Sequence, residues 1–182
     1  MSVIVGLVSG GHVYMAADTR CLEGYEQGDT KKLFVNKHSQ WGMWAIGAAG
    51  YMRNSEIAAE LDLPTLRWKD KRNTTTSMLC RGYFDALRGE IGNRGILKDG
   101  DSETAFMLAV GGRLFEVESS FCMTEILASN AVGTGAPYAK GALWALLKYN
   151  PTMPPEQMVR AAVESAIRHN VSVGGKIEVV VI

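Results

Sequence analysis

Few residues in this chain combine the types and the spacing that enzymatic chemistry usually requires. His12 and His38 could act as general bases for a serine such as Ser9. No Gly-x-Ser-x-Gly motif, the sharp turn that presents a nucleophilic serine, accompanies them. Histidines are common in loops, so these residues alone do not indicate a catalytic triad.

The three cysteines do not form a metal-binding pattern. Cys21, Cys80 and Cys122 lie far apart, and the sequence has no Cys-x-x-Cys pair or Cys/His cluster with zinc-ligand spacing. We therefore expect three reduced, mostly buried thiols and neither a metal site nor a cofactor.

Composition excludes several classes of protein. The 182 residues include 19 Lys+Arg and 19 Asp+Glu, with 47% hydrophobic and 21% charged residues. This balance is typical of a folded globular domain and gives no support to nucleic-acid binding, which needs a basic excess. Apolar runs are far shorter than the ~20 residues of a membrane helix. The first residues lack the basic region of a secretory signal, so we expect a cytoplasmic protein.

The hydrophobic pattern predicts the elements that position the polar residues. Short runs rich in β-branched and aromatic residues predict strands near 3–8, 13–17, 32–35, 41–46, 104–110, 113–117, 123–127 and 177–182. Residues 22–30 are polar and contain glycine, which indicates a loop. Apolar stripes with helical spacing predict helices over 55–61, from cap candidates at 73–76 through 87, over 137–149 and from 155 onward.

The order of these elements predicts the fold class. Strands, two helices, strands, two helices and a strand favour antiparallel sheets covered by helices, an α+β arrangement, over a parallel βαβ fold. We found no repeats or linkers, so we expect residues 1–182 to form one domain.

Several motifs follow one another in order along the chain, beginning with the stretch from Val5 through Tyr14 to Arg20 and with Lys31-Lys32-Leu33. The first stretch resembles the opening of the proteasome β-subunits and of the bacterial HslV peptidase, and the second falls where that family has a lysine followed by an aliphatic residue. The segments at 46–50, 132–139 and 172–177 resemble a small-residue loop, a helix opening and a Gly-Gly turn before the final strand. Each motif is weak, but their order over nearly the whole chain is fairly specific.

The resemblance implies an N-terminal-nucleophile fold, a four-layer αββα sandwich of two antiparallel sheets flanked by helices. It also implies a homo-oligomeric ring of peptidase subunits that hydrolyses protein or peptide substrates, with an ATP-dependent unfoldase as a partner. Neither nucleic acid nor a membrane is implied.

Ser2 takes the place of the family's N-terminal threonine nucleophile. Serine is small enough for removal of the initiator Met1 to be expected, which would expose the Ser2 α-amine. An α-amine has a pKa near ~8, so it is partly neutral at pH 7 and can accept the hydroxyl proton. Serine lacks the methyl group that restrains threonine's rotamer, so lower peptidase efficiency would not be surprising.

Other positions acquire roles from the same resemblance. Lys32 corresponds to the lysine that stabilises the deprotonating hydroxyl, and Asp18 to its paired aspartate. Gly47 corresponds to the oxyanion N–H donor, and Thr134 to a serine beside the nucleophile's amine. Asn170 stands where many subunits have an aspartate, and an amide can form hydrogen bonds there but supplies no charge.

The sequence is also compatible with two other functions. The chain could be a catalytically silent, ring-forming structural paralogue, which retention of Met1, the serine at position 2 and Asn170 would favour. It could also be a small-molecule amidohydrolase with the same fold. Cleavage specificity and ring size do not follow from the sequence.

Overall fold

A computed structural model describes residues 2–23, 26–65 and 76–182. Its elements, in chain order, are β1 (Ile4–Ser9), β2 (His12–Asp18), β3 (Arg20–Glu23), β4 (Glu26–Asp29), β5 (Leu33–His38), β6 (Gly42–Ala49), α1 (Met52–Glu60), α2 (Thr76–Arg94), β7 (Ala105–Val110), β8 (Arg113–Val117), β9 (Met123–Ile126), β10 (Ser129–Val132), α3 (Ala136–Tyr149), α4 (Pro155–His169) and β11 (Ile177–Val181).

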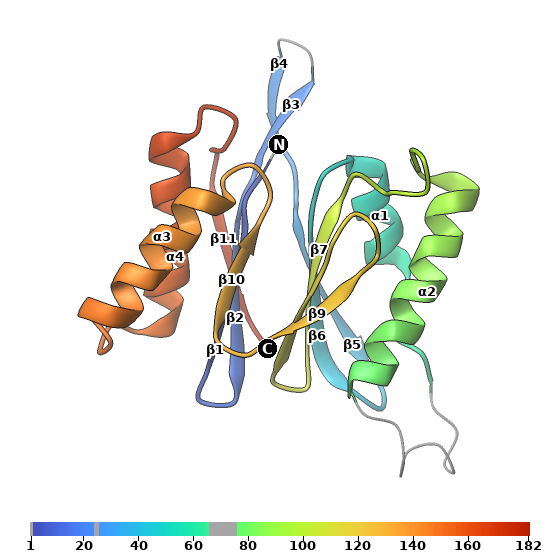
Figure 1. Ribbon diagram of the computed structural model, residues 1–182, viewed down its shortest axis with the longest axis horizontal. Coiled ribbons are helices and arrows are strands. Elements are labelled where there is room, and N and C mark those ends of the chain that lie inside the picture. The colour runs from blue at the N-terminus through green and yellow to red at the C-terminus, as the bar shows by residue number, and fades with distance from the viewer. Residues whose placement is uncertain (1, 24–25, 66–75) are drawn as a thin grey trace.

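Two antiparallel sheets face each other between two pairs of helices (Figure 1). One sheet has the strand order β10-β1-β2-β11 and is covered by α3 and α4, while the other has the order β5-β6-β7-β8-β9 and is covered by α1 and α2. The short β3–β4 hairpin forms a separate sheet and projects beyond both. The predicted αββα sandwich is therefore confirmed.

Alternation along the strands divides the core into three layers. Val3, just before β1, and Val5 and Leu7 within it pack toward α3 and α4, whereas Ile4 faces the other sheet. Successive side chains of a strand point to opposite faces, so a strand between two layers must be apolar on both. This explains why β1 is an almost continuous apolar run rather than an alternating one.

The structure differs from the sequence predictions at several element boundaries. Residues 22–30 were expected to form a loop, but they contain most of the β3–β4 hairpin. Strand β10 was not predicted, because its sequence Ser-Asn-Ala-Val is half polar. Helix α1 begins at Met52, before the expected start at Ser55, and the cap candidates 73–75 lie outside the described residues.

No helix in the described part of the chain is long and apolar enough to span a membrane.

Candidate active site

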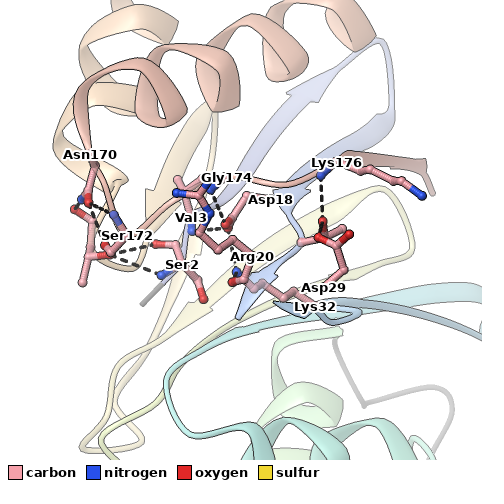
Figure 2. Close-up of polar contacts among 12 residues, drawn as sticks. Ser2, Val3, Asp18, Arg20, Asp29, Lys32, Asn170, Ser172, Gly174 and Lys176 are labelled. Carbon is pink, nitrogen blue, oxygen red and sulfur yellow. Dashed lines mark hydrogen bonds and ion pairs between the residues drawn. The ribbon is translucent and has the colours of Figure 1, made fainter. Parts of the chain in front are cut away.

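Asp18, the last residue of β2, is fully buried and its carboxylate accepts three hydrogen bonds. Oδ1 accepts from the Val3 N–H and from Lys32 Nζ, both at 2.9 Å, and Oδ2 accepts from the Gly174 N–H at 3.0 Å (Figure 2). A buried carboxylate needs such donors to offset its desolvation. Asp18 therefore joins the chain start, the lysine and the turn before β11.

Lys32 lies just before β5 and is almost completely buried. Its Nζ donates to Asp18 and, at 2.6 Å, to the Arg20 carbonyl. Burial lowers the pKa of Lys32 below its ordinary value, and the charge of Asp18 opposes that shift. The paired ammonium is thus a buried cation held by two acceptors.

Ser2 is buried at the N-terminal side of β1, next to the loop before α3. Its main-chain nitrogen lies 3.3 Å from Thr134 Oγ1, and its carbonyl accepts from the Gly135 N–H at 3.2 Å. Gly133 has a φ of +94°, and a Cβ at that position would overlap the Ser2 carbonyl oxygen. The predicted neighbours Ser2 and Thr134 are therefore brought together by a turn that requires glycine.

A chain of neutral groups continues from Thr134 to Ser172 and Asn170, and Figure 2 labels the last two. Thr134 Oγ1 lies 3.2 Å from Ser172 Oγ, which in turn donates to Asn170 Oδ1 at 2.7 Å. The Asn170 amide donates back to the Thr134 carbonyl at 2.9 Å. Asn170 thus reaches the Ser2 nitrogen through two hydroxyls, and no member of this chain carries a charge.

A cavity of about 620 Å³ opens beside Ser2 and Lys32. The hairpin side supplies Arg20, Cys21, Leu22 and Thr30. The remaining lining residues are Ser2, the two lysines just before β5, residues from the end of β6 to the first turn of α1, and Glu103 from the loop before β7. The cavity has the size of a pocket for a small molecule or a peptide side chain.

The prediction that Gly47 presents its N–H to this site is wrong. Gly47 is inside β6, paired with Leu33 and Met107, and it faces the other sheet. A Cβ there would lie 2.7 Å from Ile4 Cγ2, so glycine at this position permits close packing of the sheets. It does not line the cavity.

Gly50 takes the position by the cavity that was expected for Gly47. It follows the last residue of β6 and lines the cavity together with Ser2. Within the described part of the chain, its N–H donates to no acceptor. Gly47 and Gly50 both belong to the small-residue segment 46–50, and only the strand register distinguishes them.

Sequence reasoning also missed Ser172 and the role of Arg20. Ser172 joins Thr134 to Asn170 through hydrogen bonds. Its position between Asn170 and the Gly-Gly turn is the sequence feature that could have identified it. Arg20 lines the cavity, and its carbonyl holds Lys32. Among the described residues, no group of three or more His, Cys, Asp or Glu side chains is placed to bind a metal ion.

Solved structures with the same fold include members of three groups of proteins. Thiobacillus denitrificans BPH in complex with epoxomicin has a TM-score of 0.80 and 20% identity, covering 99% of this chain and 97% of that one. HslV from Trypanosoma brucei has a TM-score of 0.71 and 18% identity, covering 98% of each chain. Anbu from Pseudomonas aeruginosa, solved as a helical assembly, has a TM-score of 0.75 and 17% identity, covering 99% of this chain and 80% of that one.

No curated protein matches the chain closely enough in sequence to add to this comparison. The sequence model that describes proteasome subunits matches residues 2–182, which include every residue of the site described above. This match agrees with the four-layer fold and with the ordered motifs of the sequence. The chain belongs to the proteasome subunit family.

Proposed function

We propose that this chain is a peptidase whose nucleophile is Ser2 after removal of Met1. The observation that carries the proposal is the placement of Ser2, whose nitrogen lies 3.3 Å from Thr134 Oγ1, at a cavity that it shares with Lys32. A hydroxyl, a main-chain nitrogen and a buried cation thus adjoin a space that can hold a substrate side chain. That combination suits a nucleophile activated by its own amine.

The reaction begins when the neutral Ser2 α-amine takes the proton of Ser2 Oγ. Oγ attacks the peptide carbonyl carbon, and the carbonyl π electrons move to its oxygen, forming a tetrahedral intermediate. The C–N bond then breaks, the protonated α-amine returns its proton to the leaving amine, and an acyl-enzyme ester remains. Water, deprotonated by the same α-amine, attacks the ester and releases the second product as Ser2 Oγ is reprotonated.

Two groups stabilise the negative charge in this scheme. The Lys32 ammonium favours loss of the hydroxyl proton, and Asp18 holds that ammonium in place. We assign the oxyanion donor to the Gly50 N–H, because it lines the cavity and donates to no acceptor in the described part of the chain. A donor of this kind contributes about 3–4 kcal/mol of transition-state stabilisation in other acyl-transfer enzymes.

Replacement of Ser2 tests the proposal directly. Ser2→Ala keeps a small residue after Met1 and removes only the hydroxyl, so turnover of a fluorogenic peptide amide should be lost. Ser9→Ala, the same substitution at the far end of β1, is the matched control and should keep native turnover. Intact mass should show a chain without Met1 and, after incubation with epoxomicin, an adduct that Ser2→Ala does not form. Native turnover in Ser2→Ala would refute the assignment.

We also propose that the subunits form a homo-oligomeric ring. The support is the family match together with exposed aromatic residues on α3, where Trp144 is 59% and Tyr149 is 70% exposed. Large exposed apolar side chains of this kind mark interaction surfaces. A ring that encloses its sites excludes folded substrates, so an ATP-dependent unfoldase is the partner that this arrangement requires. Closed rings are the expected result of negative-stain imaging, and a strict monomer would contradict this proposal.

One observation favours a second function, a silent ring-forming paralogue. The chain from the Ser2 nitrogen to Asn170 contains only neutral groups, so no carboxylate there supports the amine. The intact mass of the chain separates the two functions. A silent subunit can retain Met1, whereas catalysis through Ser2 requires that Met1 has been removed.

A further inference from the structure

The β3–β4 hairpin is attached at its base to the turn that precedes β11 (Figure 2). This turn, residues 170–176, follows α4 and contains the Gly174-Gly175 pair. The hairpin belongs to neither large sheet and projects beyond both (Figure 1). Its position therefore depends on a few contacts at its base rather than on a strand ladder with the rest of the molecule.

Thr19 and Asp29 form the first of these contacts. Thr19 is buried, and its hydroxyl donates to Asp29 Oδ1 at 2.6 Å while accepting from the Lys176 N–H at 2.8 Å. The Thr19 carbonyl also accepts from the Thr30 N–H at 2.7 Å, which ties the two ends of the hairpin together. A single hydroxyl thus connects the end of the hairpin at Asp29 with the turn at Lys176.

Gly175 makes the close approach of these groups possible. Its φ is +77°, and a Cβ there would lie 2.5 Å from Asp29 Oδ1. Any side chain at position 175 would displace the carboxylate. The backbone of the turn is therefore shaped to the Thr19–Asp29 contact.

Arg20 supports the same turn from the other strand of the hairpin. Its N–H donates to the Gly174 carbonyl at 2.9 Å, and its guanidinium donates to the Val171 carbonyl at 2.8 Å. A Cβ at Gly174 would overlap the guanidinium, so the arginine lies directly against the turn. Residues from both ends of the hairpin thus hold one short segment.

This segment contacts both halves of the candidate site. Ser172 bonds to Thr134, which faces the Ser2 nitrogen, and the Gly174 N–H donates to the Asp18 carboxylate. The hairpin in turn provides Arg20, Cys21, Leu22 and Thr30 to the lining of the cavity. A shift of the hairpin relative to the turn would therefore move one wall of the cavity.

We propose that Thr19 and Asp29 are positioning residues that lock the hairpin wall of the cavity to the 170–176 turn and thereby control substrate binding. Neither residue lines the cavity, so both act through the groups that they hold. The effect on binding rests on the proposed peptidase function, whereas the lock itself does not.

The test compares disruptive and conservative substitutions in the full chain. Thr19→Val keeps the shape of the side chain and removes its hydroxyl, and Thr19→Ser restores a hydroxyl. Asp29→Ala removes the acceptor from an exposed side chain, so folding is not at risk, and Asp29→Asn restores an acceptor oxygen. With a fluorogenic tetrapeptide amide, we expect the two disruptive variants to raise KM about 10-fold while kcat stays within about threefold. The two conservative variants should keep KM within about threefold of native.

Amide hydrogen exchange tests the lock without any need for activity. The Lys176 N–H loses its acceptor in Thr19→Val, so its exchange should accelerate at least about 10-fold, while Thr19→Ser should retain native protection. Native KM in both disruptive variants would overturn the proposal, as would native Lys176 protection in Thr19→Val or equal damage from the conservative variants. If the native chain hydrolyses no peptide, the peptidase function fails, and the exchange rates still decide whether the lock exists.

Discussion

Replacing Asp18 by asparagine should destabilise the protein strongly at neutral pH. The carboxylate is fully buried and accepts from Val3, Lys32 and Gly174 at 2.9–3.0 Å. Asparagine preserves the shape but has one acceptor oxygen instead of two, and its NH₂ group must face one of these donors. The variant also leaves the Lys32 ammonium buried without its counter-charge.

The magnitude follows from breaking a buried ion pair on one side. Removing a single partner typically costs about 3–5 kcal/mol, because the remaining charge stays desolvated. A protein of this size loses about 2–4 °C in Tm for each kcal/mol, so Tm should fall by about 6–20 °C at pH 7. The double variant Asp18→Asn/Lys32→Met also removes the ammonium, so no unpaired charge stays buried. It should therefore be more stable than Asp18→Asn alone.

The cost of Asp18→Asn should decrease as the pH rises. Burial already lowers the pKa of Lys32 below 10.5, and Asp18 opposes the shift, so removing Asp18 lowers this pKa further. The folded variant then binds fewer protons than its unfolded chain over a wider range below pH 10.5, and its stability rises with pH across that range. At high pH Lys32 loses its proton, and the neutral amine no longer carries the free-energy cost of an unpaired buried charge.

Urea denaturation of native and variant proteins at pH 7 and at pH 9.5 is the assay. We expect a large difference in the free energy of unfolding at the lower pH and a smaller one at the higher pH. A difference below about 1 kcal/mol at pH 7, the size of an ordinary neutral hydrogen bond, would refute the assignment of Asp18 and Lys32 as a buried ion pair. A difference that does not change with pH would refute the explanation based on the lysine charge.

Three further predictions concern the hydrogen-bonded chain from the Ser2 nitrogen through Thr134 and Ser172 to Asn170, the oxyanion donor and the core. Asn170→Asp adds a carboxylate to this hydrogen-bonded chain, so it should raise the pKa of the Ser2 amine and move the acidic limb of the kcat/KM profile to higher pH. An unchanged acidic limb would show that the charge at position 170 does not affect the amine. Gly50→Ala places a Cβ 2.5 Å from the Glu103 carbonyl oxygen, so it should displace the Gly50 N–H and lower kcat about 10²-fold, and native kcat would exclude Gly50 as the donor. Tyr83→Phe removes a buried 2.5 Å hydrogen bond to the Ala58 carbonyl and should cost about 1–2 kcal/mol in chemical denaturation, whereas an unchanged midpoint would mean that this bond adds no net stability.

Local patterns in the sequence were sufficient to predict antiparallel sheets covered by helices, whereas the four-layer arrangement followed from the family resemblance. The apolar runs in β1, β6 and β7 predict strands because strand side chains alternate between two faces, and both faces are buried here. The amphipathic stripe of α4 likewise predicts a helix lying on a sheet. Residues 22–30 gave no such signal, because a hairpin outside the main core buries little apolar surface and is held by backbone pairing and contacts at its base.

The family resemblance of the motifs around Asp18 and Lys32 was enough to predict that the two residues belong to one site. The choice between Gly47 and Gly50 needed the folded structure, because a strand register depends on partners such as Met107, far along the chain. The folded structure also joined Ser172 to Thr134, 38 residues apart. Hydrogen bonds between distant segments depend on how the layers pack, and that packing cannot be predicted from local residue patterns.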